Sequence, residues 1–357
     1  MAANLPTNEP AGAKKLPAIK RRTISVTPEA MVRAGHLHAG QTLPLVLEPA
    51  VEGVNLLAWA AQQRDSVERQ LLQYGAILFR NFAGVTSNEF EQFCGVLSRE
   101  LLEYRERSSP RSRVSGRVYT STDYPANQSI FPHNEHSYSL TFPLRLYFFC
   151  ETAAAEGGET PIADTRKILR RIDPQIRARF VEKKWMYVRN FGDGFGLSWQ
   201  TVFQTTDRSV VEQYCRGADI SVEWKEGNRL RTRQVRDAIT THPLTGEPVW
   251  FNHATFFHVS TLEPGIRQTL LAEFSEEDLP NNSYYGDGSP IEPEVLEHLR
   301  RAYAEETVSF PWQQGDILLI DNMLTAHARA PYTGARRILV TMADPFTRPD
   351  AAPSLDQ

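Results

Sequence analysis

The chain has 357 residues, of which 41% are hydrophobic and 23% charged, and its formal net charge of −4 gives no basis for a nucleic-acid partner. No apolar run is long enough to span a bilayer and no secretory leader is visible, so we expect a cytoplasmic protein without a membrane partner. The widely spaced Cys94, Cys150 and Cys215 indicate packed free thiols, not a disulfide or zinc framework.

The first segment of the chain is a polar, basic stretch. Residues 1–25 are rich in Ala, Pro, Asn and Lys, a composition that predicts a disordered tail. We interpret residues 26–357 as one domain, because no linker or repeat interrupts them. Within residues 105–130 the sequence is again polar and predicts a long loop, where Tyr119, Ser121 and Thr122 could border a site.

Hydrophobic periodicity and turn residues define the other elements. Helices are predicted over Leu56–Tyr74, Glu89–Leu97, 165–182 (divided at Asp173-Pro174), Asp207–Arg216 and Val295–Ala304. Strands are predicted over 76–79, Leu144–Glu151, Met186–Phe191, Ile220–Trp224, Leu230–Val235, Pro248–Phe257, Thr307–Phe310, Asp316–Asp321, Leu324–Ala328 and Arg337–Met342. Many short strands with helices near the N-terminal side favour a mainly β protein with peripheral helices around a double-stranded β-helix (jelly roll, cupin-like) core.

The stretch FPHNEH contains the clearest candidate for metal chemistry. On an extended segment, His133 and Glu135 point to the same face, whereas Asn134 and His136 point to the other. One imidazole nitrogen and one carboxylate oxygen are two of the three ligands of the 2-His-1-carboxylate triad that holds non-haem Fe(II). The pair alone is a weak signal, so a third ligand decides the interpretation.

The best candidate for the third ligand is His327, near the end of a predicted strand that can lie beside the His133 strand in a barrel. The other histidines compete less well: His253 and His258 lie in an aromatic stretch, and His242 and His298 have no apparent partner. Two arginines, Arg336 and Arg337, follow a glycine turn after His327, where a guanidinium can bind a carboxylate through two parallel hydrogen bonds. Taken alone, this pair fits a solvated surface equally well.

With these residues in view, the sequence resembles the taurine dioxygenase/TfdA-like family of Fe(II)- and 2-oxoglutarate-dependent oxygenases, and within it the SyrP-like branch of natural-product enzymes. The matching pieces occur in family order from about residue 75 to residue 346. They are FPHNEHSYS, GGETPIAD, GLSWQTVFQT, RLRTRQV, PVWFN, YYGDGSPI and GDILLIDNMLTAHARAPYTGARRILVTMADPF.

The resemblance implies roles for particular residues. His133, Glu135 and His327 are the implied ligands of Fe(II), and Thr160 is the implied partner of a 2-oxoglutarate carboxylate. Arg337 matches the arginine that pairs with the distal carboxylate, with Arg336 as the neighbour that could take its place. Thr341 stands where the taurine enzyme has a sulfonate-binding arginine, which argues against a sulfonate substrate. Because Glu135 retains the carboxylate that related halogenases lack, chlorination is not expected.

The resemblance also implies the reaction. Fe(II), 2-oxoglutarate and O2 are the implied cofactor and cosubstrates, succinate and CO2 the by-products, and hydroxylation of an aliphatic C–H bond the default outcome, with desaturation and cyclisation as alternatives. The implied substrate is an amino acid, an amino-acid derivative or an aminoacyl group tethered to a carrier protein. Residues expected near it are Trp199, Asn252, His253 and Phe256, although ordinary core positions explain them equally well.

Two other classes of function remain open from the sequence. One is a catalytically silent barrel that binds a small molecule, and the other is a zinc hydrolase that uses His133, Glu135 and His327. Neither explains why Thr160 and an arginine after His327 accompany the candidate ligands. The sequence is compatible with a monomer or a homo-oligomer.

Overall fold

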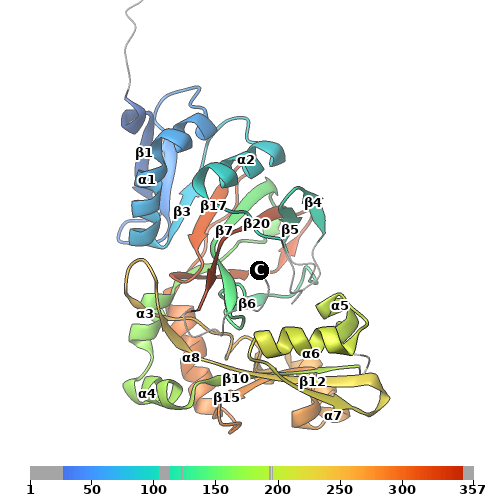
Figure 1. Cartoon of the computed structure of the whole chain (residues 1–357). Helices are drawn as coiled ribbons and strands as arrows, with labels where there is room; N and C mark the ends of the chain where they lie inside the picture. The colour runs from blue at the N-terminus through green and yellow to red at the C-terminus, as the bar shows by residue number, and fades with distance from the viewer. Residues whose placement is uncertain (1–26, 104–111, 122–123, 193, 195, 349–357) are drawn as a thin grey trace, which may run out of the picture.

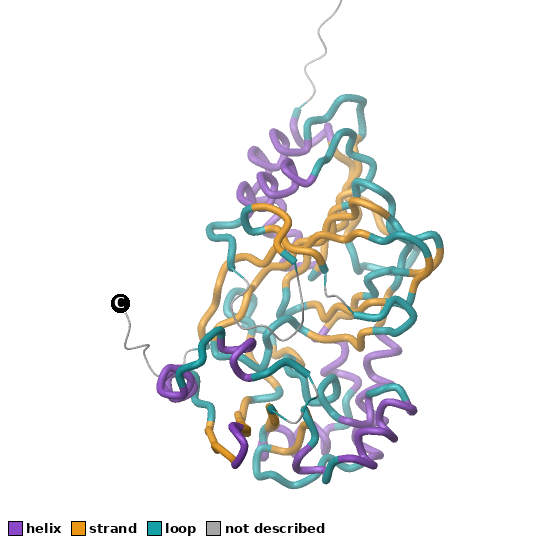
Figure 2. The backbone as a smooth tube through the Cα atoms, turned by 90° about the vertical axis from the view of Figure 1, so that its right-hand side faces the viewer, coloured by secondary structure: helices purple, strands orange, loops and turns teal. Residues whose placement is uncertain are grey.

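The computed structural model describes residues 27–103, 112–121, 124–192, 194 and 196–348. The predicted disordered tail, residues 1–25, lies outside these ranges, as does Thr122. Strands fill the middle of the molecule and helices gather toward its two ends (Figure 2). No helix in the described part of the chain is both long and apolar enough to cross a membrane.

The largest sheet has eight strands and is antiparallel except where its second and third strands pair. In spatial order these strands are β1 (Val32–His36), β2 (Leu45–Pro49), β3 (Ala76–Phe79), β17 (Ile317–Asp321), β7 (Thr141–Thr152), β20 (Arg337–Thr347), β5 (Val118–Thr120) and β4 (Arg113–Ser115). Strands β3 and β17 are apolar at nearly every position, as expected for strands covered on both faces.

A smaller antiparallel sheet faces the large one. Its strands, in spatial order, are β16 (Thr307–Val308), β9 (Ile162–Asp164), β18 (Thr325–Arg329) and β6 (Ile130–His133). A separate two-stranded pair is formed by β8 (Glu156–Gly157), which precedes β9 in the chain, and β19 (Tyr332–Thr333), which follows β18. Side chains of both sheets form one cluster, in which Ile162 of the small sheet meets Phe148 and Ile320 of the large sheet. This double-sheet core confirms the predicted jelly roll.

Helices cover the outer face of the large sheet. The amphipathic α1 (Leu56–Tyr74) and α2 (Ser87–Leu97) pack on it near β3 (Figure 1). The Asn55 side chain caps α1 by accepting from the Ala58 N–H, and α1 ends at Gly75, which adopts a left-handed φ of 81°. A capping box between Thr86 and Glu89 begins α2.

The middle of the chain forms a second layered unit below the jelly roll in Figure 1. It contains the sheet β11 (Ser221–Lys225), β12 (Arg229–Arg236), β10 (Trp185–Phe191) and β15 (Asn281–Tyr285), and the hairpin β13 (Ile239–Thr241) with β14 (Pro248–Trp250). The helices here are α3 (Thr165–Arg171), α4 (Pro174–Lys183), α5 (Trp199–Phe203), α6 (Arg208–Gly217), α7 (Pro264–Glu273) and α8 (Pro293–Glu306). The short 3₁₀ turns η2 (Glu226–Asn228), η3 (Val259–Thr261) and η4 (Glu276–Asp278) belong to this unit, whereas η1 (Pro28–Met31) precedes β1 at the other end of the molecule.

Most of the elements expected from sequence are present. The break at Asp173-Pro174 is confirmed, with the Asp173 carboxylate capping α4, and the hairpin around residues 226–228 is confirmed. The long loop predicted for residues 105–130 is wrong in part, because it contains the hairpin β4–β5. The strand predicted over Pro248–Phe257 ends at Trp250, and α5, α7 and the β1–β2 pair were not anticipated.

Candidate metal centre and pocket

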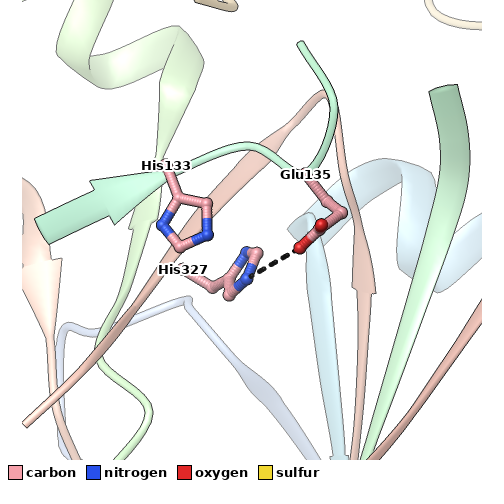
Figure 3. Close-up of side chains that lie close together, drawn as sticks. All are labelled: His133, Glu135 and His327. Atoms are coloured by element: carbon pink, nitrogen blue, oxygen red, sulfur yellow. Dashed lines mark ion pairs between the residues drawn. The ribbon is translucent and has the colours of Figure 1, made fainter. Parts of the chain in front are cut away.

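Three side chains converge between the two sheets. His133 ends β6, Glu135 follows in the next turn, and His327 lies in the middle of β18, directly opposite His133 in the strand pairing. Their donor atoms all lie within 4.8 Å of one another, with 3.9 Å between His327 Nε2 and Glu135 Oε2 (Figure 3). No other group of three such side chains is found among the described residues. Glu135 reaches this cluster through a turn, so the expected alternation along a strand is wrong.

A hydrogen bond fixes how the His133 ring presents its nitrogens. His133 Nδ1 lies 2.9 Å from the carbonyl oxygen of Phe131. Because a carbonyl only accepts, Nδ1 carries the proton and the lone pair lies on Nε2. Such a bond to the distal nitrogen is typical of metal-binding histidines. The ring of His327 is held in turn between the rings of His133 and Phe148, with centroids 4.3 and 5.1 Å away.

Asn322, which the sequence reasoning missed, fastens the Glu135 segment to the strand that carries His327. Its side-chain oxygen accepts from the Glu135 N–H at 2.8 Å, and its amide nitrogen donates to the Glu135 carbonyl at 2.8 Å. The Asn134 side chain donates to the Asn322 carbonyl at 2.6 Å. All three residues are buried. The only sequence signal was an Asp-Asn pair directly after a buried strand.

The neighbouring Asp321 orders the turn between β17 and β18. One carboxylate oxygen accepts from two backbone N–H groups of the turn, and the other lies 3.0 Å from Nε2 of the buried His242. His242 therefore has a structural partner, contrary to expectation. His298 also has one, because its Nε2 accepts from the Asp173 N–H at 3.0 Å.

Two further histidines, His136 and His258, were considered as ligands from the sequence. His136 does not point away from the carboxylate: its Nε2 lies 3.4 Å from Glu135 Oε1, on a backbone with a φ of 55°. His258 caps the turn η3 at a distance from the cluster. Burial, together with the charge of Arg300, lowers the pKa of His258 to about 4, so this ring is neutral at physiological pH.

A pocket opens beside the histidines, between the inner faces of the two sheets. Its lining residues are Ser121, Ile130, His133, Phe148, Thr160, His327, Ala328, Arg329, Arg336, Ile338 and Val340. At its polar end the Thr160 hydroxyl accepts from the indole N–H of Trp312 at 3.2 Å. Arg336 donates from Nε to the Gly158 carbonyl at 2.8 Å and from Nη1 to Ser121 Oγ at 3.3 Å. Burial, followed by the charge of Arg329, lowers the pKa of Arg336 to about 10.

Arg336, and not Arg337, lies at the pocket, which corrects the first choice made from sequence. The Arg337 side chain is 50% exposed and pairs with Glu151 at 2.7 Å. The pairing of β20 with β7 shifts register between Arg337 and Ile338. Alternation along the strand places Arg336, Ile338 and Val340 on one face, and all three line the pocket, whereas Arg337 points to the other side.

The position of Thr341 also differs from the one expected by resemblance to the taurine enzyme. Thr341 is fully buried and donates from Oγ1 to the carbonyl of Arg117. Its strand neighbours Leu339 and Ala343 belong to the cluster under α1 and α2, whereas Val340 lines the pocket. Thr341 therefore faces away from the pocket and carries no information about a sulfonate substrate.

The four residues expected near the substrate divide into two pairs. The rings of Phe256 and His253 lie 4.7 and 5.6 Å from that of His133, so both border the candidate metal centre. His253 is buried, hydrogen-bonds to Ser137 Oγ at 2.6 Å, and has a pKa well below its usual value, first because of burial and then because of His133.

The side chains of Trp199 and Asn252 bind other parts of the protein, and their place near the substrate stays a prediction. Trp199 is buried in a separate cluster under α5 and α6, and its indole N–H donates to the Asn228 carbonyl at 3.1 Å. Asn252 uses its side chain within its own loop, donating to the Ala238 carbonyl and accepting from the Ala254 N–H, both at 2.9 Å. Both side chains therefore have partners within the protein.

Comparisons with known proteins agree with these features. The model of the taurine catabolism dioxygenase TauD, TfdA family matches residues 41–343. The dapdiamide synthesis protein DdaC of Enterobacter agglomerans is 42% identical over 279 residues, which cover 78% of this chain and 85% of that protein. A clavaminate synthase-like protein of Arabidopsis thaliana is 30% identical over 290 residues, covering 78% and 84%.

Solved structures share the fold. PvcB of Pseudomonas aeruginosa matches with a TM-score of 0.54 at 17% identity, over 89% of this chain and 92% of its own. A second structure, of PvcB as an Fe, alpha-ketoglutarate dependent oxygenase from an isonitrile synthetic pathway, matches with a TM-score of 0.55 at 18% identity, over 92% and 97%. From the family match together with the convergent His133, Glu135 and His327, we conclude that the chain belongs to the TauD/TfdA family of Fe(II)- and 2-oxoglutarate-dependent dioxygenases.

Proposed function

We propose that the protein hydroxylates an aliphatic C–H bond of an amino acid, an amino-acid derivative or a carrier-tethered aminoacyl group, with His133, Glu135 and His327 as the ligands of Fe(II). The observation that carries this proposal is the convergence of two imidazoles and one carboxylate beside a pocket with a buried arginine. That donor set, with coordination positions left for other ligands, is the facial triad of Fe(II) oxygenases.

The three residues fit a ferrous ion on chemical grounds. His133 has its Nδ1 proton engaged by a carbonyl, which leaves Nε2 as the donor. Two ligands of one ion at ~2.1 Å each lie no more than roughly 4.2 Å apart, and 3.9 Å separates His327 Nε2 from Glu135 Oε2. When bound, the iron with 2-oxoglutarate and O2 supplies the oxidising chemistry that inserts an oxygen atom into the C–H bond.

The polar end of the pocket supplies the groups to hold 2-oxoglutarate. Because the Thr160 oxygen already accepts from Trp312, its own proton is available to donate to a carboxylate. Arg336 is oriented by the Gly158 carbonyl and by Ser121, and its terminal nitrogens can form a charge-assisted pair with the distal carboxylate. We therefore propose Thr160 and Arg336 as the carboxylate anchors, in place of Arg337.

The substrate class is proposed from the environment of the metal centre and from relatives. Phe256 is only half-buried and lies beside His133, so its ring can orient an aliphatic chain near the iron. DdaC is named for dapdiamide synthesis and PvcB for an isonitrile pathway, which supports a role in natural-product biosynthesis. Three buried free cysteines suit a reducing compartment such as the cytoplasm.

A succinate-release screen tests this function. The purified protein, with Fe(II), 2-oxoglutarate and O2, is presented with amino acids, their derivatives and carrier-bound forms, and products are analysed by mass spectrometry. The proposal predicts one substrate class with succinate formed in equal amount to a product heavier by one oxygen atom. A product lighter by two hydrogen atoms would instead indicate desaturation or ring formation. Turnover that continues without O2 would contradict the proposal and favour a hydrolase.

A further inference from the structure

Arg329 lines the same pocket but has no role in the function described so far. It is the last residue of β18 and lies two positions after His327. Residues two apart on a strand point to the same face, and both side chains line the pocket. Arg329 is only 6% exposed. An arginine is rarely buried to this extent unless it is paired, so its partners show what it does.

Three of its N–H groups hold one loop. Nη1 donates to the Tyr124 carbonyl at 3.0 Å, and Nη2 donates to the carbonyls of Pro125 and Gln128 at 2.6 and 2.8 Å. This loop, residues 124–128, leads directly into β6, the strand that ends at His133. The guanidinium of Arg329 thus ties β18, which carries His327, to the loop that leads into the His133 strand.

The Nε–H group and the positive charge have no such use. Arg329 Nε is buried and has no hydrogen-bond partner in the described part of the chain. Arg336 lies close by, since the guanidinium carbons of both arginines are 5.5 and 5.4 Å from the centre of the Tyr332 ring. Among the described residues, neither arginine forms an ion pair with a carboxylate, and Glu159 affects the pKa of Arg336 less than burial and Arg329 do.

The buried charge of Arg329 and the half-buried charge of Arg336 therefore face one pocket without a matching negative charge among the described residues. Burial lowers the pKa of both arginines, as expected when a charged group loses its hydration. A buried charge without a partner is unfavourable, so the pocket favours a ligand that brings negative charge.

We propose that Arg329 is a second cosubstrate-binding arginine, which directs its Nε–H and its charge to the distal carboxylate of 2-oxoglutarate while holding the loop 124–128 that leads into β6. This inference rests on the proposed function, because it takes 2-oxoglutarate as the pocket's ligand. It assigns the preference for a dicarboxylate to two arginines rather than one. It also makes the loop and the cosubstrate share a single guanidinium.

Binding measurements separate this role from that of a loop fastener. We would titrate the full-length, Fe(II)-loaded protein anaerobically, by calorimetry, with 2-oxoglutarate and with 2-oxopentanoate, which lacks the distal carboxylate. R329M should weaken 2-oxoglutarate binding by ~10- to 100-fold, as expected for lost hydrogen bonds to a charged group, and 2-oxopentanoate binding by far less. R329K, which keeps the charge but not the planar fork, should lose less of the preference for the dicarboxylate. R337M is the matched control and should bind both as the wild type does.

Several outcomes would overturn the inference. If folded R329M keeps the wild-type preference for 2-oxoglutarate, or if both ligands weaken equally, Arg329 only fastens the loop, and the proposed function stands. If R329M does not fold, hydrogen exchange of the wild type decides. Amides of residues 124–128 should slow with 2-oxoglutarate but not with 2-oxopentanoate, and an equal response would contradict the proposal. A wild type that binds no 2-oxoglutarate would defeat the proposed function itself, and this inference with it.

Discussion

We predict opposite effects on 2-oxoglutarate binding when the adjacent residues Arg336 and Arg337 are each replaced by methionine. Arg336 lines the pocket and is held by Gly158 and Ser121. Arg337 is half-exposed and pairs with Glu151. R336M removes the guanidinium that we assign to the distal carboxylate, whereas R337M removes only a surface ion pair, which contributes about 0–1 kcal/mol to stability.

The size of the effect follows from the contacts. Hydrogen bonds to a charged group contribute about 1.5–3 kcal/mol each, so losing a bidentate pair costs about 3 kcal/mol. At ~1.4 kcal/mol per tenfold change in affinity, R336M should raise the Kd for 2-oxoglutarate on the order of 100-fold. Because Arg336 is a half-buried charge without an ion pair among the described residues, R336M should destabilise the ligand-free protein little.

Thermal melting with and without cosubstrate measures this difference. At a 2-oxoglutarate concentration of 100 times the wild-type Kd, the wild type gains about 2.7 kcal/mol of stability. The same concentration is close to the Kd expected for R336M, so this variant gains only about 0.4 kcal/mol. R337M should show the full wild-type shift, and its KM for 2-oxoglutarate should stay within roughly 2-fold, since a surface ion pair of this kind is worth so little. A lost shift in R337M together with a normal shift in R336M would refute the register assigned to β20.

Three further changes probe the surroundings. G158A should raise the KM for 2-oxoglutarate, because a Cβ there would lie 2.9 Å from the Arg336 side chain; G227A, strained alike at a φ of +70° but with open space, should leave it unchanged. N322A should weaken Fe(II) binding ~10- to 100-fold in an equilibrium titration while the circular dichroism spectrum persists, and wild-type affinity would contradict the clamp on Glu135. The three buried cysteines should resist a thiol reagent at pH 8 until denaturant is added. Burial raises the pKa of Cys150 to about 12 and that of Cys94 well above its usual value, so little thiolate is present to react. Fast labelling of the native protein would contradict this.

The sequence was sufficient where chemistry and local periodicity coincide. His133, Glu135 and His327 could be selected because few residue sets can bind Fe(II), and the strand pairing brings His327 opposite His133. Helix α1 and the divided helix at Asp173-Pro174 were predictable because caps and apolar spacing are local signals.

The sequence was insufficient where the place of a side chain depends on one residue of strand register or on one contact that is distant in sequence. Which of the two adjacent arginines enters the pocket depends on one residue of register, because a one-residue slip in a strand moves every side chain to the other face. Asn322 contacts Glu135 across 187 positions of sequence, so nothing local marked it. Trp199 stands in a family motif, yet its burial in a separate cluster depends on how α5 packs.

The central claim is that His133, Glu135 and His327 bind one ferrous ion next to a bound 2-oxoglutarate. The most direct measurement is the visible absorption spectrum of the anaerobic protein after addition of Fe(II) and then 2-oxoglutarate. We expect a metal-to-ligand charge-transfer band in the wild type and none in folded H327A. A wild type without the band, or an H327A protein with the full band, would contradict the account.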